Sequence, residues 1–201
     1  MNSIFEIGPN VKLAIFDLGG IIMPIRMDKT AAAFAKLGAH EIKAHVSASH
    51  AHDGVFNVYQ NGKISTPDFL RAVREETGVR GSDDEIRDAW NAMLHDPDEE
   101  RLKFIDEIRK RVPTVLLSNT NDMHIVWARE HMKPYGGFEH YFQKTYLSHE
   151  VFLSKPDPQI YLLVLKEMGV EAKDAVFFDD SPLNIDAAKA LGIDARLVEP
   201  L

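Results

Sequence analysis

Residues 13 to 22 read LAIFDLGGII, an apolar run that is interrupted by one acid, Asp17, and a pair of glycines. We expect Val11 to Phe16 to form a buried strand, because apolar residues follow one another there instead of alternating with polar ones. This pattern is typical of a parallel sheet that is covered on both faces. An ionised side chain at the end of such a strand is costly unless it has a partner or a function. Asp17 is therefore the first candidate functional residue.

Further apolar runs follow later in the chain: TVLLS at 114–118, AVFFD at 175–179 and IDARLV at 193–198. Helical patterns separate these runs. The alternation of strands and helices predicts an α/β fold with a Rossmann-like parallel sheet and right-handed crossovers.

The stretch from residue 27 to 99 breaks this alternation, since it carries helix signals and no convincing strand. For example, we expect Thr66 to cap a helix that ends at Gly78. The sequence thus predicts two domains. A core contains residues 1–26 and 100–201, and an all-helical domain is inserted between its first two strands at 27–99.

The composition excludes several classes of site and partner. The chain has 201 residues, a formal net charge of −8 and no cysteine, so disulfides, thiolate metal sites and cysteine nucleophiles are excluded. No cluster of Lys and Arg indicates a nucleic-acid partner, and no stretch approaches the ~20 apolar residues that span a membrane. We expect a cytoplasmic protein whose partner is neither a nucleic acid nor a membrane.

Ligands of open parallel sheets bind where the carboxyl ends of the strands meet. In chain order, the polar residues at or near these ends are Asp17, Ser118, Asn119, Lys155, Asp179, Asp180 and Asn184. Crowded carboxylates stay ionised together most easily around a divalent cation, and Mg²⁺ accepts carboxylates, water and a phosphate oxygen as ligands. Lys155 and the Ser118 hydroxyl can hold other phosphate oxygens, and one carboxylate can attack phosphorus. These residue types favour a phosphate substrate and Mg²⁺.

Four motifs in this order resemble the haloacid dehalogenase (HAD) superfamily: FDLGG at 16–20, LLSNT at 116–120, SKPDPQIY at 154–161 and FFDDSPLN at 177–184. The resemblance is to the phosphatase-like branch with a helical cap after the first strand. It implies a Mg²⁺-dependent phosphomonoesterase that acts on a small phosphorylated metabolite through an aspartyl-phosphate intermediate.

The resemblance also implies a role for each motif residue. The expected roles are Asp17 as nucleophile and metal ligand, the Gly19 carbonyl and Asp180 as further metal ligands, Ser118 and Asn119 as phosphoryl-binding residues, Lys155 as the cation that neutralises nucleophile and phosphate, and Asp179 and Asn184 as supporting residues.

Gly19 departs from the usual family pattern. Phosphatases of this superfamily usually carry a second aspartate two residues after the nucleophile, which protonates the leaving oxygen and later deprotonates the attacking water. Gly19 keeps the carbonyl and lacks the acid, a loss often worth roughly 10²–10⁴-fold in rate. Sequences with FDLG occur in a branch that includes sugar-phosphate phosphatases, such as those acting on glucose 1-phosphate.

Two other functions remain open at this point. One is a non-catalytic binding or regulatory protein that kept the fold. The other is a 2-haloacid dehalogenase, which works without a metal. The acidic pair Asp179 and Asp180 disfavours the dehalogenase, because a metal-free site for an anionic substrate gains nothing from so much negative charge.

The histidines of the insertion are weak metal-site candidates. His50 and His52 are two residues apart, so a helix would point them in different directions, and we expect exposed loop histidines there and at His95. Trp90 follows an apolar helical stripe and is expected in the core of the insertion. The stretch VYQNGKIS at 58–65 either faces the active site or is a turn between helices.

Overall fold

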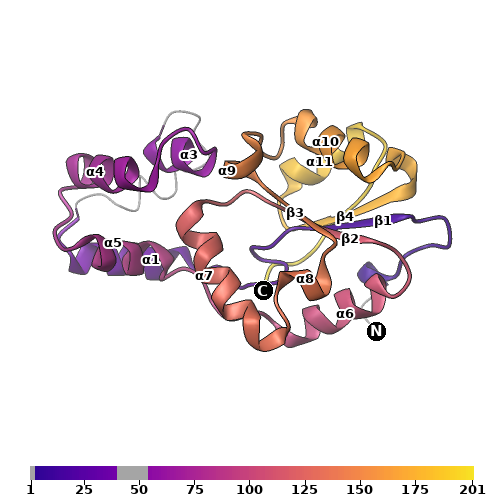
Figure 1. Cartoon of the computed structure of the whole chain (residues 1–201), viewed down its shortest axis with the longest axis horizontal. Coiled ribbons are helices and arrows are strands. Elements are labelled where there is room, and N and C mark those ends of the chain that lie inside the picture. The colour runs from indigo at the N-terminus through magenta and orange to yellow at the C-terminus, as the bar shows by residue number, and fades with distance from the viewer. Residues whose placement is uncertain (1–2, 40–53) are drawn as a thin grey trace.

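The computed structural model describes residues 3–39 and 54–201, and their strands form one parallel sheet (Figure 1). The strand order is β3-β2-β1-β4-β5. The strands are β1 (Leu13–Phe16), β2 (Thr114–Ser118), β3 (Lys144–Leu147), β4 (Ala175–Asp179) and β5 (Asp194–Leu197). The predicted α/β fold with a parallel sheet is confirmed.

Helices cover both faces of the sheet (Figure 1). On one face lie α10 (Pro158–Met168) and α11 (Pro182–Ala190), and on the other lie α6 (Glu99–Arg109), α7 (Asp122–Met132) and α8 (Phe138–Tyr141).

The strand β1 shows why its apolar run is nearly continuous. Leu13 and Ile15 pack among the side chains of α10 and α11, while Ala14 and Phe16 pack among those of α6, α7 and α8. All four are fully buried, because successive side chains of a strand point to opposite faces and both faces are covered.

The sequence prediction missed the strand β3. It is a four-residue edge strand in which Lys144 is exposed and only Tyr146 and Leu147 are buried. Lys144 and Thr145 are polar, so no continuous apolar run marks this strand in the sequence. The first and last predicted strands were also too long, since β1 begins at Leu13 and β5 runs from Asp194 to Leu197.

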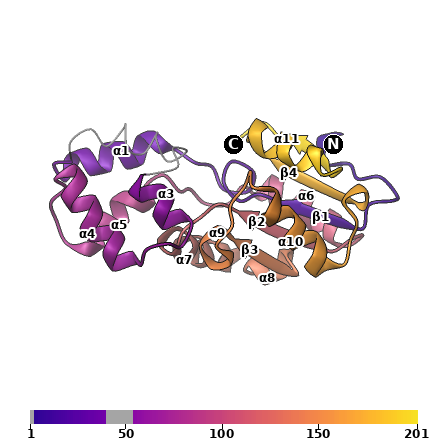
Figure 2. The ribbon, with the colours of Figure 1, turned by 90° about the horizontal axis from the view of Figure 1, so that it is seen from above.

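A cluster of helices lies beside the sheet and has its own apolar core (Figure 2). It contains α1 (Met27–Lys36), α3 (Val55–Gln60), α4 (Thr66–Thr77) and α5 (Asp83–Asn91), and we call it the helical segment. Phe69 and Trp90 are buried in its core, which confirms the prediction for Trp90. The N-cap of α4 is Ser65 and not Thr66, because the Ser65 hydroxyl accepts the hydrogen bond from the Asp68 amide.

The helical segment is attached to the core at the short helix α9 (Ser148–Val151), which follows β3. The buried Ser148 hydroxyl donates to the carbonyl of Gln60 at 2.7 Å and accepts from the amide of Thr120 at 2.9 Å. Gly62 has a φ of 68°, and a Cβ there would lie 2.2 Å from the carbonyl oxygen of His149. The stretch at 58–65 is thus the end of α3 and the turn that leads to α4, and it docks on the core.

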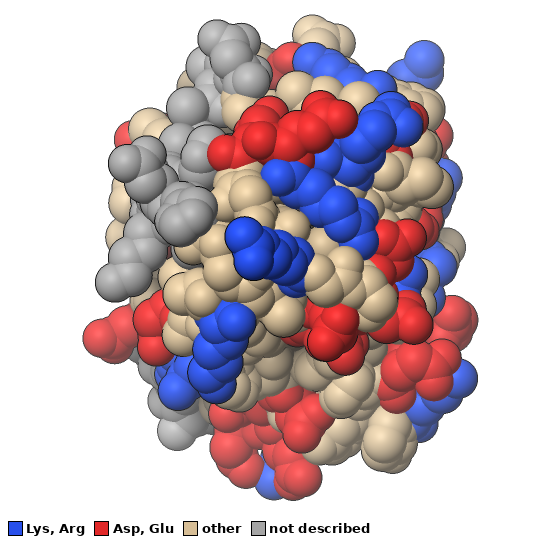
Figure 3. Space-filling model, turned by 90° about the vertical axis from the view of Figure 1, so that its left-hand side faces the viewer, with Lys and Arg blue, Asp and Glu red and all other residues tan. Residues whose placement is uncertain are grey.

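The outer end of the helical segment carries charges of both signs (Figure 3). Acidic and basic side chains alternate there and form ion pairs, such as Arg74 with Asp83 at 2.6 Å. This mixture differs from the basic face that nucleic-acid binding requires. Among the described residues, no helix has the length and apolar character to cross a bilayer.

We expect Gly62→Ala to destabilise the protein more than Gly169→Ala. Both glycines follow a helix with nearly the same φ, 68° and 65°, so both substitutions carry about 1 kcal/mol of backbone strain. Nothing lies within 4 Å of a Cβ at Gly169, whereas the backbone of His149 must move for a Cβ at Gly62, which adds ~1–3 kcal/mol. Urea unfolding of the two variants measures the difference, and equal losses would contradict the close docking.

Candidate active site

Asp17 comes directly after the central strand β1 and lies between the ends of two neighbouring strands. Residue pairing aligns Phe16 with Leu116 of β2 and with Phe178 of β4. The amide of Asp17 donates to the carbonyl of Phe178 at 3.0 Å, which fixes the backbone of Asp17 against β4. The next residue of β4 is Asp179, so the two carboxylates arrive at the same edge of the sheet.

Lys155 lies between these carboxylates. Its ammonium Nζ is 2.8 Å from Oδ1 of Asp17 and 2.6 Å from Oδ2 of Asp179. The Lys155 side chain is 1% exposed and that of Asp179 is 0% exposed. A charge removed from water to this extent is stable only with partners of opposite charge, and the two carboxylates supply them.

Both carboxylate oxygens of Asp179 accept hydrogen bonds. Besides Lys155, its carboxylate accepts from the amide of Ser181 at 2.8 Å and from the side chain of Asn184 at 3.0 and 3.1 Å. Ser181 is the N-cap residue of α11 and Asn184 lies in its first turn. The loop and helix after β4 therefore hold Asp179 in place, which fits a supporting position.

Asp180 packs against the glycine pair of the first motif. A Cβ at Gly20 would lie 2.2 Å from Oδ2 of Asp180, and Gly20 has a φ of 74°. Gly20 is thus the position that requires glycine. A Cβ at Gly19 would meet only the side chain of Ile25, at 3.1 Å, and the φ of Gly19 is not in the left-handed region.

Burial and neighbouring charges perturb the ionisable groups of this site. Desolvation raises the pKa of Asp17 to about 7, with Lys155 opposing the shift and the charges of Asp179 and Asp180 adding to it. Burial and the charge of Asp179 also raise the pKa of Asp180. Burial lowers the pKa of Lys155, but the two carboxylates beside it outweigh burial and leave this pKa raised.

The donor set at this edge fits a hard divalent cation. Asp17, Asp179 and Asp180 offer carboxylate oxygens that lie within 4.8 Å of one another. Because donors already occupy Asp179, Asp17 and Asp180 are the carboxylates best placed to hold Mg²⁺. The carbonyl of Gly19 stays a predicted ligand.

The two predicted phosphoryl-binding residues lie at the end of β2. Ser118 is the last residue of the strand, is 3% exposed and pairs in register with Leu147 of β3. Asn119 follows it, and its side-chain amide bonds to the backbone of Lys155. This contact was not predicted, because nothing in the motif LLSNT indicates a bond to a residue 36 positions away.

Polar residues at the start of α7 join the site to the helical segment, and sequence reasoning missed them. His124 stacks on Trp90 with the ring centroids 4.7 Å apart, and burial lowers the pKa of His124 to about 4. The Asn121 side chain bonds to both, at 3.3 Å to the Trp90 ring nitrogen and 3.1 Å to the His124 ring. Nearby, the Tyr59 hydroxyl is 2.8 Å from the Thr66 hydroxyl. The only sequence signal was the run NTND before a helix, which is typical of an N-cap.

The histidines expected in exposed loops are only partly covered by the structure. His95 is exposed, as predicted. His40, His45, His50 and His52 lie outside the described residues.

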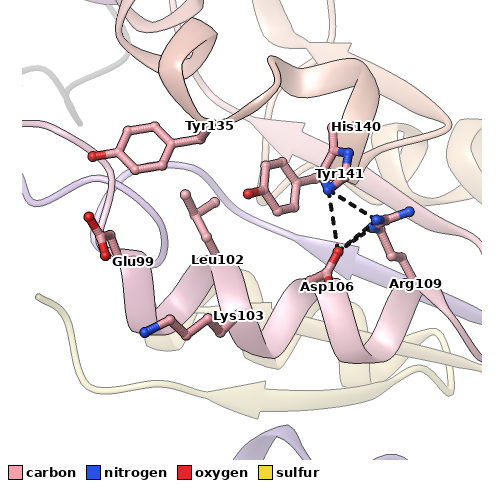
Figure 4. Close-up of a pocket in the computed structure, with 8 residues that line it drawn as sticks. All are labelled: Glu99, Leu102, Lys103, Asp106, Arg109, Tyr135, His140 and Tyr141. Atoms are coloured by element: carbon pink, nitrogen blue, oxygen red, sulfur yellow. Dashed lines mark hydrogen bonds and ion pairs between the residues drawn. The ribbon is translucent and has the colours of Figure 1, made fainter.

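A hollow of about 480 Å³ lies elsewhere, along α6 and α8 (Figure 4). Tyr135 and Tyr141 line it together with three side chains that pair among themselves. Asp106 is 2.7 Å from Arg109 and 3.3 Å from His140. These three charges pair with one another on the wall of the hollow, away from the carboxylates at the strand ends.

A family model for haloacid dehalogenase-like hydrolases matches residues 11–192. The chain belongs to this family. The D-ribitol-5-phosphate phosphatase of Bacteroides thetaiotaomicron is 31% identical over 186 residues, which cover 92% of this chain and 90% of the relative. The phosphorylated carbohydrates phosphatase of Thermotoga maritima is 25% identical over 194 residues, which cover 92% of this chain and 83% of the relative.

A solved structure extends the likeness to three dimensions. A HAD family enzyme from Bacteroides thetaiotaomicron, in complex with magnesium and inorganic phosphate, has a TM-score of 0.87 and 34% identity, with 93% of each chain covered. The present chain is therefore a HAD hydrolase in both sequence and fold.

We expect the metal-free HAD hydrolase to lose stability as pH rises from about 4 to about 7. In this range folded Asp17 binds a proton that the unfolded chain has released, because its pKa is raised from 3.8 to about 7. The unfolded chain therefore binds fewer protons than the folded protein in this range, so the free energy of unfolding falls with rising pH. Asp17→Asn should flatten this slope and raise the stability near pH 7.5. Urea unfolding at pH 5 and 7.5 with EDTA checks both, and parallel pH profiles for the two proteins would contradict the raised pKa.

Proposed function

We propose that this HAD hydrolase is a Mg²⁺-dependent phosphomonoesterase that works through an aspartyl-phosphate on Asp17. The observation that carries the proposal is the contact of the Asp17 carboxylate with the buried ammonium of Lys155, 2.8 Å away, at the end of the central strand. A phosphoryl group that approaches Asp17 therefore meets a cation, and we expect the hydroxyl of Ser118, at the end of the neighbouring strand β2, to bind another phosphoryl oxygen. The magnesium and phosphate bound by the similar Bacteroides enzyme support the same chemistry.

The reaction follows from these positions. An Asp17 oxygen forms a bond to phosphorus as the bond from phosphorus to the ester oxygen breaks, and water later cleaves the acyl phosphate to release phosphate and free Asp17. Lys155 neutralises charge that accumulates between carboxylate and phosphoryl oxygens. Mg²⁺ held by Asp17 and Asp180 would supply further positive charge to the phosphoryl oxygens.

The substrate class we propose is a small phosphorylated carbohydrate or polyol. Two relatives that match over most of their length are named for phosphorylated carbohydrates or ribitol 5-phosphate. We also propose that residues 27–99 form a cap domain on a core of residues 1–26 and 100–201, with the helical segment docked beside the strand ends. The cytoplasmic location stays a prediction.

The first test uses p-nitrophenyl phosphate with and without Mg²⁺. Asp17→Asn should abolish hydrolysis, because an amide is a poor nucleophile, and EDTA should abolish it reversibly. Asp180→Asn should mainly raise the Mg²⁺ concentration needed for half-maximal rate. Full turnover in EDTA would refute the proposed dependence on Mg²⁺. Halide release from 2-chloropropionate serves as the control for dehalogenase activity, and we expect none.

A second test addresses the missing acid at Gly19. Without a proton donor, the rate should depend steeply on the leaving group, so aryl and anomeric phosphates should react faster than phosphates of primary alcohols. The Tyr59 hydroxyl does not replace the donor, because Tyr59 is 2% exposed and is bonded to Thr66 and to the Met123 amide. A flat wild-type series would show that another group supplies the proton.

Gly19→Asp should restore the donor and help poor leaving groups more than good ones. The backbone at Gly19 tolerates a side chain, but Ile25 must shift, since its Cγ1 lies 3.1 Å from the new Cβ. The matched control is Ile25→Ala alone, and the double variant Gly19→Asp with Ile25→Ala should show the larger gain, because alanine lacks the Cγ1 atom. An equal effect of Gly19→Asp on all leaving groups would refute the proton-donor role.

A further inference from the structure

Lys155 lies in the loop between α9 and α10, yet its ammonium is held within 2.8 Å of two carboxylates. A loop residue needs some other element to fix its backbone. Both backbone polar groups of Lys155 bond to the same side chain, that of Asn119. The Asn119 Nδ2 donates to the Lys155 carbonyl at 2.7 Å, and the Lys155 amide donates to the Asn119 Oδ1 at 2.9 Å.

An asparagine suits this contact for a geometric reason. Its side-chain amide carries one acceptor and a donor in one plane, so it can pair with a backbone amide and carbonyl as a strand partner does. Such pairing needs an extended residue, and Pro156 restricts Lys155 toward extended conformations. Aspartate lacks the donor and serine lacks the second group, so neither can form both bonds.

The position of Asn119 also ties two loops together. It follows Ser118 at the end of β2, beside β3, whose own loop leads to Lys155. Next to it, the amide of Thr120 bonds to Ser148 of α9, so the β2 loop is itself anchored. The Asn119 side chain therefore connects the anchored end of β2 to the loop that carries Lys155.

We propose that Asn119 is a positioning residue that fixes the backbone of Lys155 and thereby holds its ammonium between Asp17 and Asp179. This inference rests on the proposed phosphatase function. It differs from the expected role of Asn119 as a phosphoryl-binding residue, because its side chain acts through Lys155 and not on the substrate.

The two roles predict different couplings in a double-mutant cycle. The measurement is p-nitrophenyl phosphate hydrolysis by the full chain at saturating Mg²⁺, with wild type, Asn119→Ala, Lys155→Ala and the double variant. Asn119→Ala should lower kcat by about 10- to 100-fold with little change in KM, as expected for a reacting group displaced by ~1 Å. In the Lys155→Ala background the same substitution should change kcat by less than about twofold.

Asn119→Asp is the second variant. It keeps the size of the side chain and the acceptor for the Lys155 amide, and it loses the donor to the Lys155 carbonyl. It should therefore lose rate as Asn119→Ala does, and it keeps the test available if the alanine variant does not fold. The inhibition constant of inorganic phosphate, measured in the Lys155→Ala background, should be the same with and without Asn119→Ala, which adds no charge.

Asn121→Ala is the matched control from the same loop. The side-chain amide of Asn121 also makes two contacts, but its partners are Trp90 of the helical segment and His124 of α7. Its effect on kcat/KM should be the same factor in the wild-type and Lys155→Ala backgrounds.

Four outcomes would overturn the assignment. A wild-type rate for Asn119→Ala would show that the contact with Lys155 is dispensable, and losses that multiply with those of Lys155→Ala would show that Asn119 acts on the substrate. If Asn121→Ala were as non-additive with Lys155→Ala as Asn119→Ala is, the coupling would reflect general loosening of the loop and not the contact of Asn119 with Lys155. A wild-type protein that hydrolyses no phosphate ester would overturn the proposed function as well, whereas the other outcomes leave that function standing.

Discussion

The site depends on the two ion pairs that the buried ammonium of Lys155 forms with Asp17 and Asp179. Parallel pairing of β1 with β4 brings Asp17 and Asp179 to one edge of the sheet, and both are buried. Two carboxylates in such a place repel each other and lose hydration. One buried cation within 2.8 Å of both offsets these costs, and the surrounding donors from Ser181 and Asn184 complete the pairing of Asp179.

The charge balance of the cluster bears on the order of binding in the proposed reaction. Three carboxylates, those of Asp17, Asp179 and Asp180, face one ammonium, so the cluster keeps an excess of negative charge. An anionic substrate meets repulsion there until a divalent cation joins the carboxylates. The chain as a whole carries a net charge of −8 and adds no general attraction for an anion.

Much of the core was predictable because burial on both faces leaves a strong signal. The runs at β1, β2 and β4 are buried throughout and mostly apolar, and each ends in a residue of the site or next to one. The strand β3 was missed because the first half of its sequence KTYL is polar, so no apolar run marks it.

Within the site, the sequence identified which residues meet but not how they are held. The ion pairs of Lys155 follow from charge and topology, whereas the bonds of Asn119 to the backbone of Lys155 depend on loop geometry. The constraint on the glycine pair was likewise hidden. Gly19 drew attention because an acid was expected there, but the close approach of Asp180 makes Gly20 the position that admits no side chain.

The Ser148 hydroxyl gives the fold an order of assembly. It joins Gln60 of the helical segment to Thr120 after β2, and these partners lie 88 and 28 residues from it along the chain. Closing loops of that length costs entropy that is recovered only when the partners are already in place. The helical segment can form its own core early, but its docking has no surface to meet until β2 and β3 have paired. We therefore expect the junction beside the strand ends to be completed late in folding, and the geometry of the site that it borders to form at the same stage.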